Sequence, residues 1–96
     1  MLSRNEVERK IKQHKPLLQE KFKVKEIGIF GSYAKGQFTD NSDVDILVSF
    51  NEPVGFEFIE LKDYLEGLLD IKVDLVTEGA LKPQIKEKIL REVLYQ

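Results

Sequence analysis

The chain has 96 residues, of which 42% are hydrophobic and 33% charged, and its formal net charge is −2 at pH 7. These values predict one compact globular domain over residues 1–96, without room for a separate substrate-recognition domain. No apolar run approaches the roughly 20 residues that a membrane span requires. Residues 1–6 also lack the apolar stretch of a secretory signal, so we expect a cytoplasmic protein with no membrane partner.

The first element is predicted to be a helix from about Arg4 to about Lys21. Ser3-x-x-Glu6 matches a capping box, and apolar residues then recur near helical spacing. Pro16 is expected to kink or restart this helix, because proline lacks the backbone N–H that the helix uses.

Two strands and a turn follow. A β-prone run from Val24 to Phe30 stops at a glycine, and residues 31–42 predict a short helical turn and then a polar loop. A second strand is expected from about Asp43 to Phe50. In it Val44, Ile46 and Val48 occupy alternate positions, so one face should be apolar.

The second half predicts a helix, a third strand and a last helix. The helix is amphipathic and should end near Asp70, and the strand runs through Ile71, Val73 and Leu75. The last helix follows Pro83 and includes Val93, with residues 93–95 as an exposed apolar patch that could contact a partner.

This order of elements predicts an α/β (α+β) fold, with a small β-sheet flanked by helices. The connection between the first two strands is only about a dozen residues long, so an antiparallel or mixed sheet is as plausible as a parallel one. The order of the strands stays open.

Three aspartates are the candidates for metal binding. Asp43 and Asp45 are two residues apart on one strand and therefore project from the same face. Asp74 lies between Val73 and Leu75 in another strand, where carboxylates are uncommon. If the two strands are neighbours, the acids repel each other and divalent cations would neutralise them. Cysteine is absent and the single His14 is expected to pack on the first helix, so oxygen ligands and hard cations such as Mg²⁺ are favoured.

A glycine turn is the candidate for phosphate binding. Gly31 and Ser32 come directly after a strand and open a helical turn, where backbone N–H groups are free to bind phosphate. Lys35 adds a positive charge, and Gly36 completes the loop. Ordinary structural turns use the same residue types, so this pattern gains weight only beside the aspartates.

Together these motifs give Gly31-Ser32, ten intervening residues, Asp43-x-Asp45 and then Asp74 on a later strand. In this pattern the sequence resembles the minimal nucleotidyltransferases of the DNA polymerase β superfamily. The resemblance extends through the motifs from about Ile29 to Val76. It implies a polymerase β-like nucleotidyltransferase core. Where relatives often carry arginine, this chain has Lys35, which keeps the charge but loses bidentate phosphate geometry.

The resemblance also implies an activity and a partner. ATP would be held by Gly31, Ser32, Lys35 and Gly36, and two Mg²⁺ ions by Asp43, Asp45 and Asp74. AMP would pass to a hydroxyl, expected to be a tyrosine, of a HEPN-type toxin whose antitoxin this chain would be. Asp74 could also help to deprotonate the acceptor.

Two other functions are open. The chain could be a non-catalytic module that neutralises its partner by covering it. It could also transfer a nucleotide to a small molecule such as an aminoglycoside, or to a nucleic-acid end. The absence of a second domain disfavours the small molecule, and the acidic isoelectric point near 5.4 makes nucleic acid an unlikely direct substrate.

Overall fold

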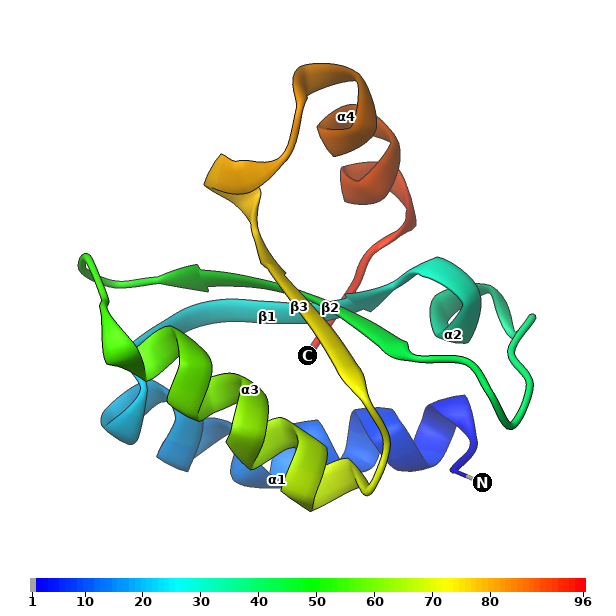
Figure 1. Cartoon of the computed structure of the whole chain (residues 1–96), viewed down its shortest axis with the longest axis horizontal. Coiled ribbons are helices and arrows are strands. Elements are labelled where there is room, and N and C mark those ends of the chain that lie inside the picture. The colour runs from blue at the N-terminus through cyan, green and yellow to red at the C-terminus, as the bar shows by residue number, and fades with distance from the viewer. Residues whose placement is uncertain (1) are drawn as a thin grey trace.

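A computed structural model describes residues 2–96 of the chain (Figure 1). Within these residues a four-stranded sheet has helices on both faces. In chain order the elements are α1 (Arg4–Lys21), β1 (Val24–Phe30), α2 (Gly31–Lys35), β2 (Val44–Phe50), α3 (Phe56–Leu69), β3 (Val73–Thr77), the 3-10 helix η1 (Glu78–Ala80), α4 (Pro83–Glu92) and β4 (Leu94–Tyr95). No helix in this described part is long and apolar enough to cross a membrane.

Helix α1 has the bounds and the start that the sequence predicts. The Ser3 hydroxyl accepts a hydrogen bond from the backbone N–H of Glu6, and the Glu6 carboxylate accepts one from the backbone N–H of Ser3, both at 3.2 Å. These bonds satisfy N–H groups that the first turn of a helix leaves without partners. Pro16 is exposed within α1, and the helix continues past it to Lys21 without a restart.

The sheet is mixed, with strand order β3-β2-β1-β4. Strand β1 pairs antiparallel with β2 and with β4, whereas β2 and β3 are parallel. The short connection through α2 joins the antiparallel pair, and α3 makes the crossover between the parallel strands. The mixed sheet is one of the arrangements that the sequence left open.

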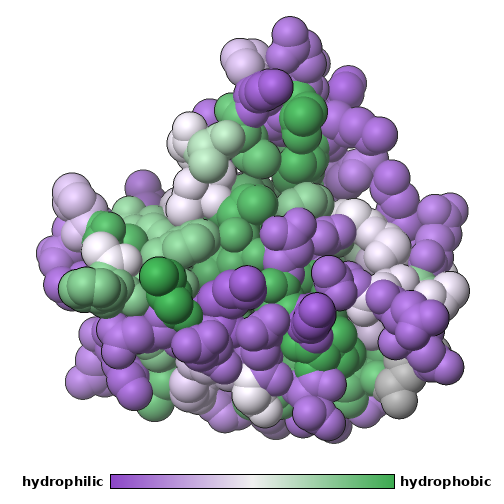
Figure 2. Space-filling model, in the orientation of Figure 1, coloured by the Kyte–Doolittle hydropathy of each residue, from purple (hydrophilic) through white to green (hydrophobic). Residues whose placement is uncertain are grey.

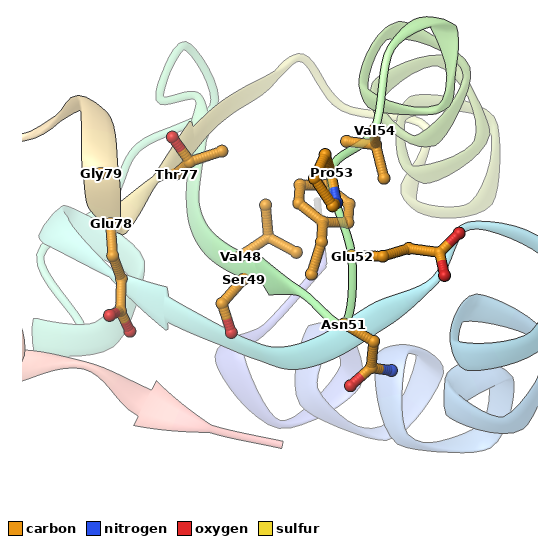
Figure 3. A pocket seen from close by; sticks show the side chains of 10 residues that line it. Val48, Ser49, Asn51, Glu52, Pro53, Val54, Thr77, Glu78 and Gly79 are labelled. Carbon is orange, nitrogen blue, oxygen red and sulfur yellow. The ribbon is translucent and has the colours of Figure 1, made fainter.

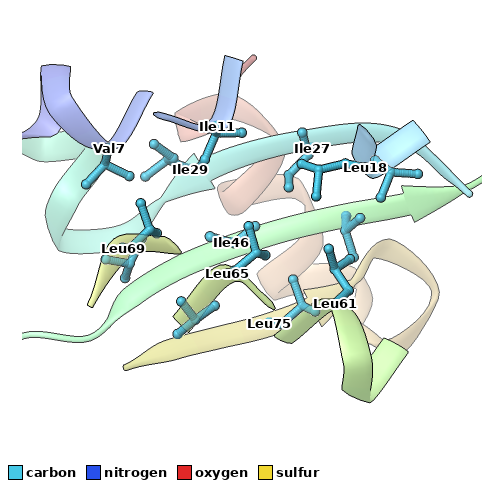
Figure 4. Packing of buried hydrophobic residues seen from close by; sticks show 14 of the residues in the cluster. Val7, Ile11, Leu18, Ile27, Ile29, Ile46, Leu61, Leu65, Leu69 and Leu75 are labelled. Atoms are coloured by element: carbon cyan, nitrogen blue, oxygen red, sulfur yellow. The ribbon is translucent and has the colours of Figure 1, made fainter. Parts of the chain in front are cut away.

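Helices α1 and α3 lie together on one face of the sheet and bury its apolar side chains (Figures 1 and 4). This core includes Val7, Ile11 and Leu18 of α1, Leu61, Leu65 and Leu69 of α3, and Ile27, Ile29, Ile46 and Leu75 of the strands. Burial of alternate residues of β2 on this face fixes the rotation of the strand about its axis. The residues between them, beginning with Asp45, therefore leave the sheet on the opposite face.

The end of the chain differs from the prediction. Helix α4 ends at Glu92, and residues 94–95 form strand β4, which pairs with β1, so the prediction that the last helix continues through these residues is wrong, although Tyr95 is exposed. Gly28 of β1 permits this pairing. A Cβ atom on Gly28 would lie 2.6 Å from Val93 Cγ2 and 3.2 Å from the Cα of Tyr95, which is too close for any other residue.

Candidate active site

Asp45 and Asp74 lie side by side on neighbouring strands. They are register partners in the parallel pairing of β2 and β3, so their side chains leave the sheet on the same face. This face is opposite the one that packs against α1 and α3. Asp45 is half-buried, whereas Asp74 and Asp43, the residue before β2, are exposed. The condition that the sequence set for an acid cluster, that these two strands are neighbours, is therefore met.

Asp45 holds a proton more readily than an ordinary aspartate. Burial, then the negative charges of Asp74 and Asp43, and a hydrogen bond to Asp74 together raise the pKa of Asp45 to about 6. Loss of water around a carboxylate and nearby like charges both disfavour the ionised form. The repulsion expected between these acids is therefore present, and either a proton or a cation would relieve it.

The carboxylates of Asp43, Asp45 and Asp74 can bind a metal ion only through oxygen atoms. Adjacent carboxylates fit a hard cation such as Mg²⁺ better than a metal that prefers nitrogen or sulfur. Within residues 2–96, no three side chains of His, Asp or Glu already converge on one point as a metal-binding group. Asp45 and Asp74 are thus adjacent. That these two residues and Asp43 bind metal together stays a prediction.

Gly31 brings the end of β1 against the acid pair. The register of the antiparallel strands places Phe30 opposite Asp45, so the next residue, Gly31, lies beside the Asp45 side chain. A Cβ atom on Gly31 would overlap the Oδ2 atom of Asp45, and the backbone of Gly31 has a φ of +70°, which favours glycine. The predicted phosphate turn and the predicted metal site are therefore in direct contact.

Comparison with known proteins identifies the family of this chain. Residues 11–95 match the nucleotidyltransferase domain family. The chain is a member of that family. This nucleotidyltransferase is 51% identical over 96 residues to the protein adenylyltransferase MntA of Thermococcus cleftensis, and the match covers 99% of this chain and 97% of the relative.

Solved structures share the fold of the nucleotidyltransferase. A candidate minimal nucleotidyltransferase superposes with a TM-score of 0.85 at 32% identity, covering 97% of this chain and 95% of that one. A chain of a toxin-antitoxin crystal structure with AMP-PNP superposes with a TM-score of 0.69 at 26% identity, covering 98% of this chain and 72% of that one. The expected fold of a minimal nucleotidyltransferase is confirmed.

Lys35, the predicted positive charge of the phosphate turn, is paired in the nucleotidyltransferase with a residue of another helix. Its Nζ atom lies 3.2 Å from Oε1 of Glu92, near the end of α4. A triphosphate at the turn would compete with Glu92 for this ammonium group. The sequence did not single out Glu92, since the two residues are far apart along the chain.

The rest of the turn is held by its backbone and by aromatic packing. The Ser32 carbonyl accepts a hydrogen bond from the N–H of Gln37 at 2.9 Å, and Gly36 ends α2 with a left-handed φ of +71°. Tyr33 is buried and stacks on Phe38, with ring centroids 4.0 Å apart. Gly36 therefore shapes the turn, and the stack, another feature that sequence reasoning missed, anchors the loop that follows.

His14 has the packing role that the sequence predicts. Its Nδ1 atom donates a hydrogen bond to the carbonyl of Lys10 at 2.9 Å, and its ring contacts Tyr64 edge to face. The hydrogen bond lies within α1, and the ring contact joins α1 to α3. The residue is part of the helix packing, on the face of the sheet opposite the acids.

Proposed function

We propose that this nucleotidyltransferase transfers AMP from ATP to a hydroxyl group of a HEPN-type toxin, with a tyrosine as the acceptor, and so acts as its antitoxin. The single observation that carries the proposal is the contact between Gly31 and the Asp45–Asp74 pair. It places a turn suited to phosphate beside carboxylates suited to Mg²⁺, as transfer of a nucleotide requires.

The relatives support the nucleotide and the class of acceptor. The relative from Thermococcus cleftensis, which has nearly the same length, is named a protein adenylyltransferase. The structural neighbour with AMP-PNP, a non-hydrolysable analogue of ATP, is a toxin-antitoxin complex. The HEPN class of the partner and the tyrosine acceptor come from the resemblance to minimal nucleotidyltransferases.

In the proposed site, Asp43, Asp45 and Asp74 would hold two Mg²⁺ ions. When bound, the ions would neutralise phosphate charge and lower the pKa of the acceptor hydroxyl. The backbone of Gly31 and Ser32 would orient the triphosphate, and Lys35 would exchange Glu92 for a phosphate oxygen. Without cations the carboxylates would repel ATP, so we expect transfer to depend strictly on a divalent ion.

The reaction would proceed as an in-line displacement. The acceptor oxygen forms a bond to the α-phosphorus of ATP while the bond from that phosphorus to the bridging oxygen breaks, and pyrophosphate leaves. The proton of the acceptor hydroxyl passes to a carboxylate. Asp74 is suited to this role because it is exposed on the open face of the sheet, where an acceptor can reach it.

The test is transfer of label from ATP to the HEPN-type protein encoded beside this chain's gene. We expect label from α-labelled ATP in the presence of Mg²⁺, and none from γ-labelled ATP, because pyrophosphate carries away the γ-phosphate. Replacing the acceptor tyrosine of the toxin by phenylalanine should abolish labelling. Comparison of the four ribonucleotides would establish the preferred base.

The outcome also separates the proposed enzyme from a module that only covers its partner. Under our proposal, Asp43→Asn abolishes both labelling and lasting neutralisation of the toxin. An Asp43→Asn chain that neutralises the toxin as well as the wild type does, while the wild type transfers no label from any nucleotide, would refute the proposal and favour the covering module.

A further inference from the structure

An apolar hollow lies at the C-terminal ends of β2 and β3, away from the acid pair. Its volume is about 370 Å³, and its lining includes Phe50, Val54, Phe58, Leu75 and Ala80. In parallel strands this end of the sheet is a common place for ligands. The shape and the chemistry of the hollow suit one large apolar side chain from a partner.

Two exposed apolar side chains lie close in sequence to the lining residues Val54 and Phe58. Phe56 and Ile59, at the start of α3, are 83% and 60% exposed. Figure 2 shows apolar atoms gathered on the left of the view, where Figure 1 has the loop between β2 and α3, and continuing toward α4. Contiguous apolar surface of this kind costs solubility unless something covers it, and it often marks a protein interface.

A second hollow of about 480 Å³ adjoins the first and adds polar groups. It shares Phe50 and Val54 with the apolar hollow and is also lined by Ser49 and Glu78, whose side chains are drawn in Figure 3. The Glu78 carboxylate accepts a hydrogen bond from the Tyr95 hydroxyl at 3.2 Å.

The polar groups of this second hollow are suited to a cation. Among residues 2–96, Glu78 takes part in none of the ion pairs, whereas Glu52, on the same hollow, is paired with Lys23 at 2.6 Å. The Ser49 hydroxyl oxygen is buried without a hydrogen-bond partner in this described part. A Lys or Arg side chain would pair with Glu78, and a further donor would satisfy Ser49.

We propose that the two hollows, with Phe56 and Ile59 beside them, form a docking surface for the protein acceptor. The partner segment that fits this docking surface presents one large apolar side chain, which enters the apolar hollow, next to a Lys or Arg that pairs with Glu78. This inference rests on the proposed function, because it names where the acceptor protein binds.

The docking surface is separate from the reacting atoms. Phe50 is five positions after Asp45 along β2, which corresponds to about 16 Å at roughly 3.3 Å per residue. A partner anchored at the hollows must therefore reach the acid pair with another part of its surface. Changes at the docking surface should weaken binding of the acceptor without changing the rate of transfer from the bound complex.

The experiment measures toxin binding and label transfer separately. Ala80→Glu places a charge in the apolar hollow, and Phe56→Asp charges the exposed apolar surface near it. Leu17→Glu, on α1, is the control at an exposed apolar residue that lines neither hollow. Each purified chain is titrated with the toxin encoded beside its gene by calorimetry, and single-turnover transfer from α-labelled ATP is followed at saturating toxin. Circular dichroism confirms that the variants fold.

We expect Ala80→Glu and Phe56→Asp each to weaken toxin binding about 30-fold or more, the range of an interface hot spot. Glu78→Gln should weaken it about fivefold, as removal of one charged pair at a rim does. Leu17→Glu should bind as the wild type does. At saturating toxin, all variants should transfer label at the wild-type rate.

Two results would refute the proposed docking surface. In one, the folded Ala80→Glu and Phe56→Asp variants bind the toxin as tightly as the wild-type chain does; in the other, the wild-type chain does not bind the toxin. Failure of the proposed function gives a different pattern. If no chain transfers label but the two variants still lose toxin binding, the docking surface stands and the proposed AMP transfer does not.

Discussion

The backbone of Gly31 lies against the carboxylate of Asp45, so closely that a Cβ atom on residue 31 would overlap Oδ2. Gly31 also has a φ of +70°, a value that residues with a side chain rarely adopt. Two independent constraints therefore require glycine here. The end of β1 can approach the acid pair on β2 and β3 only because residue 31 has no side chain.

Replacing Gly31 by alanine should disable the site. The added methyl must displace Asp45 or the turn, and a shift of about 1 Å at a reacting centre can lower the rate about 100-fold. We expect the rate of single-turnover AMP transfer to fall at least this much. The free energy of unfolding should also fall by about 1–2 kcal/mol, because alanine is strained in the left-handed backbone conformation of residue 31.

The matched control is Gly67→Ala in α3, where an added Cβ would meet open space. Alanine in a helix interior is favoured over glycine by up to about 1 kcal/mol, so this variant should be slightly more stable and fully active. Wild-type transfer by Gly31→Ala would show that the contact with Asp45 has no role in the reaction.

The raised pKa of Asp45 predicts an unusual dependence of stability on pH. The pKa is about 6 in the folded chain against an ordinary value of 3.8, so the folded state holds a proton that the unfolded state has released. The contribution of this group to stability is full below the ordinary value and is lost as pH rises through about 6.

Asp45→Asn removes this ionisation. Without metal, its melting temperature should exceed that of the wild type by a few degrees near pH 7.5, and the difference should shrink as pH falls toward 4. Addition of Mg²⁺ should raise the melting temperature of the wild type more than that of Asp45→Asn. Scanning calorimetry across this pH range tests both, and parallel pH profiles for the two chains would contradict the account.

The Lys35–Glu92 pair predicts competition with ATP. Both side chains are partly exposed, and such pairs contribute up to about 1 kcal/mol, so Glu92→Gln should lower the KM for ATP by a factor of about five or less. Lys35→Ala should raise this KM. Lys35→Arg should lower it, because a guanidinium can bind phosphate in a bidentate manner.

Steady-state kinetics at saturating toxin measures these effects. The competition would be disproved if Glu92→Gln left the KM for ATP unchanged or raised it, while Lys35→Ala raised it.

The start of α1 offers a test of stability that is separate from the site. Ser3→Ala removes the hydroxyl that accepts a hydrogen bond from the N–H of Glu6, and loss of such a cap costs about 1 kcal/mol. We expect a lower urea midpoint with an unchanged rate of transfer. An unchanged midpoint would mean that the capping box contributes nothing to folding.

Local patterns were enough to predict most of the fold. The capping box at Ser3 and the helical spacing after it predict the bounds of α1, and alternation in β2 predicts which face Asp45 occupies. These features depend on neighbours within a few residues. The predicted third strand begins at Ile71, whereas β3 begins at Val73, because the residue after α3, Asp70, is left-handed and turns the chain before the strand can start.

Features that depend on distant residues were not predicted. Strand β4 has two residues, too few for any alternation, and it forms only because Gly28 leaves room beside β1. The pairing of Lys35 with Glu92 depends on where α4 packs. The aspartates could be proposed as site residues because their spacing resembles that of a known family, whereas the strand order that brings Asp45 and Asp74 together required the structure.

The most direct test of the account is the rate of label transfer from α-labelled ATP to the toxin by Asp45→Asn, compared with Asp63→Asn, which removes an exposed carboxylate on α3. The account predicts loss of transfer in Asp45→Asn, with toxin binding kept, and a wild-type rate in Asp63→Asn. Transfer by Asp45→Asn at the rate of the wild type would contradict it, because the acid pair beside Gly31 would then not be the catalytic centre.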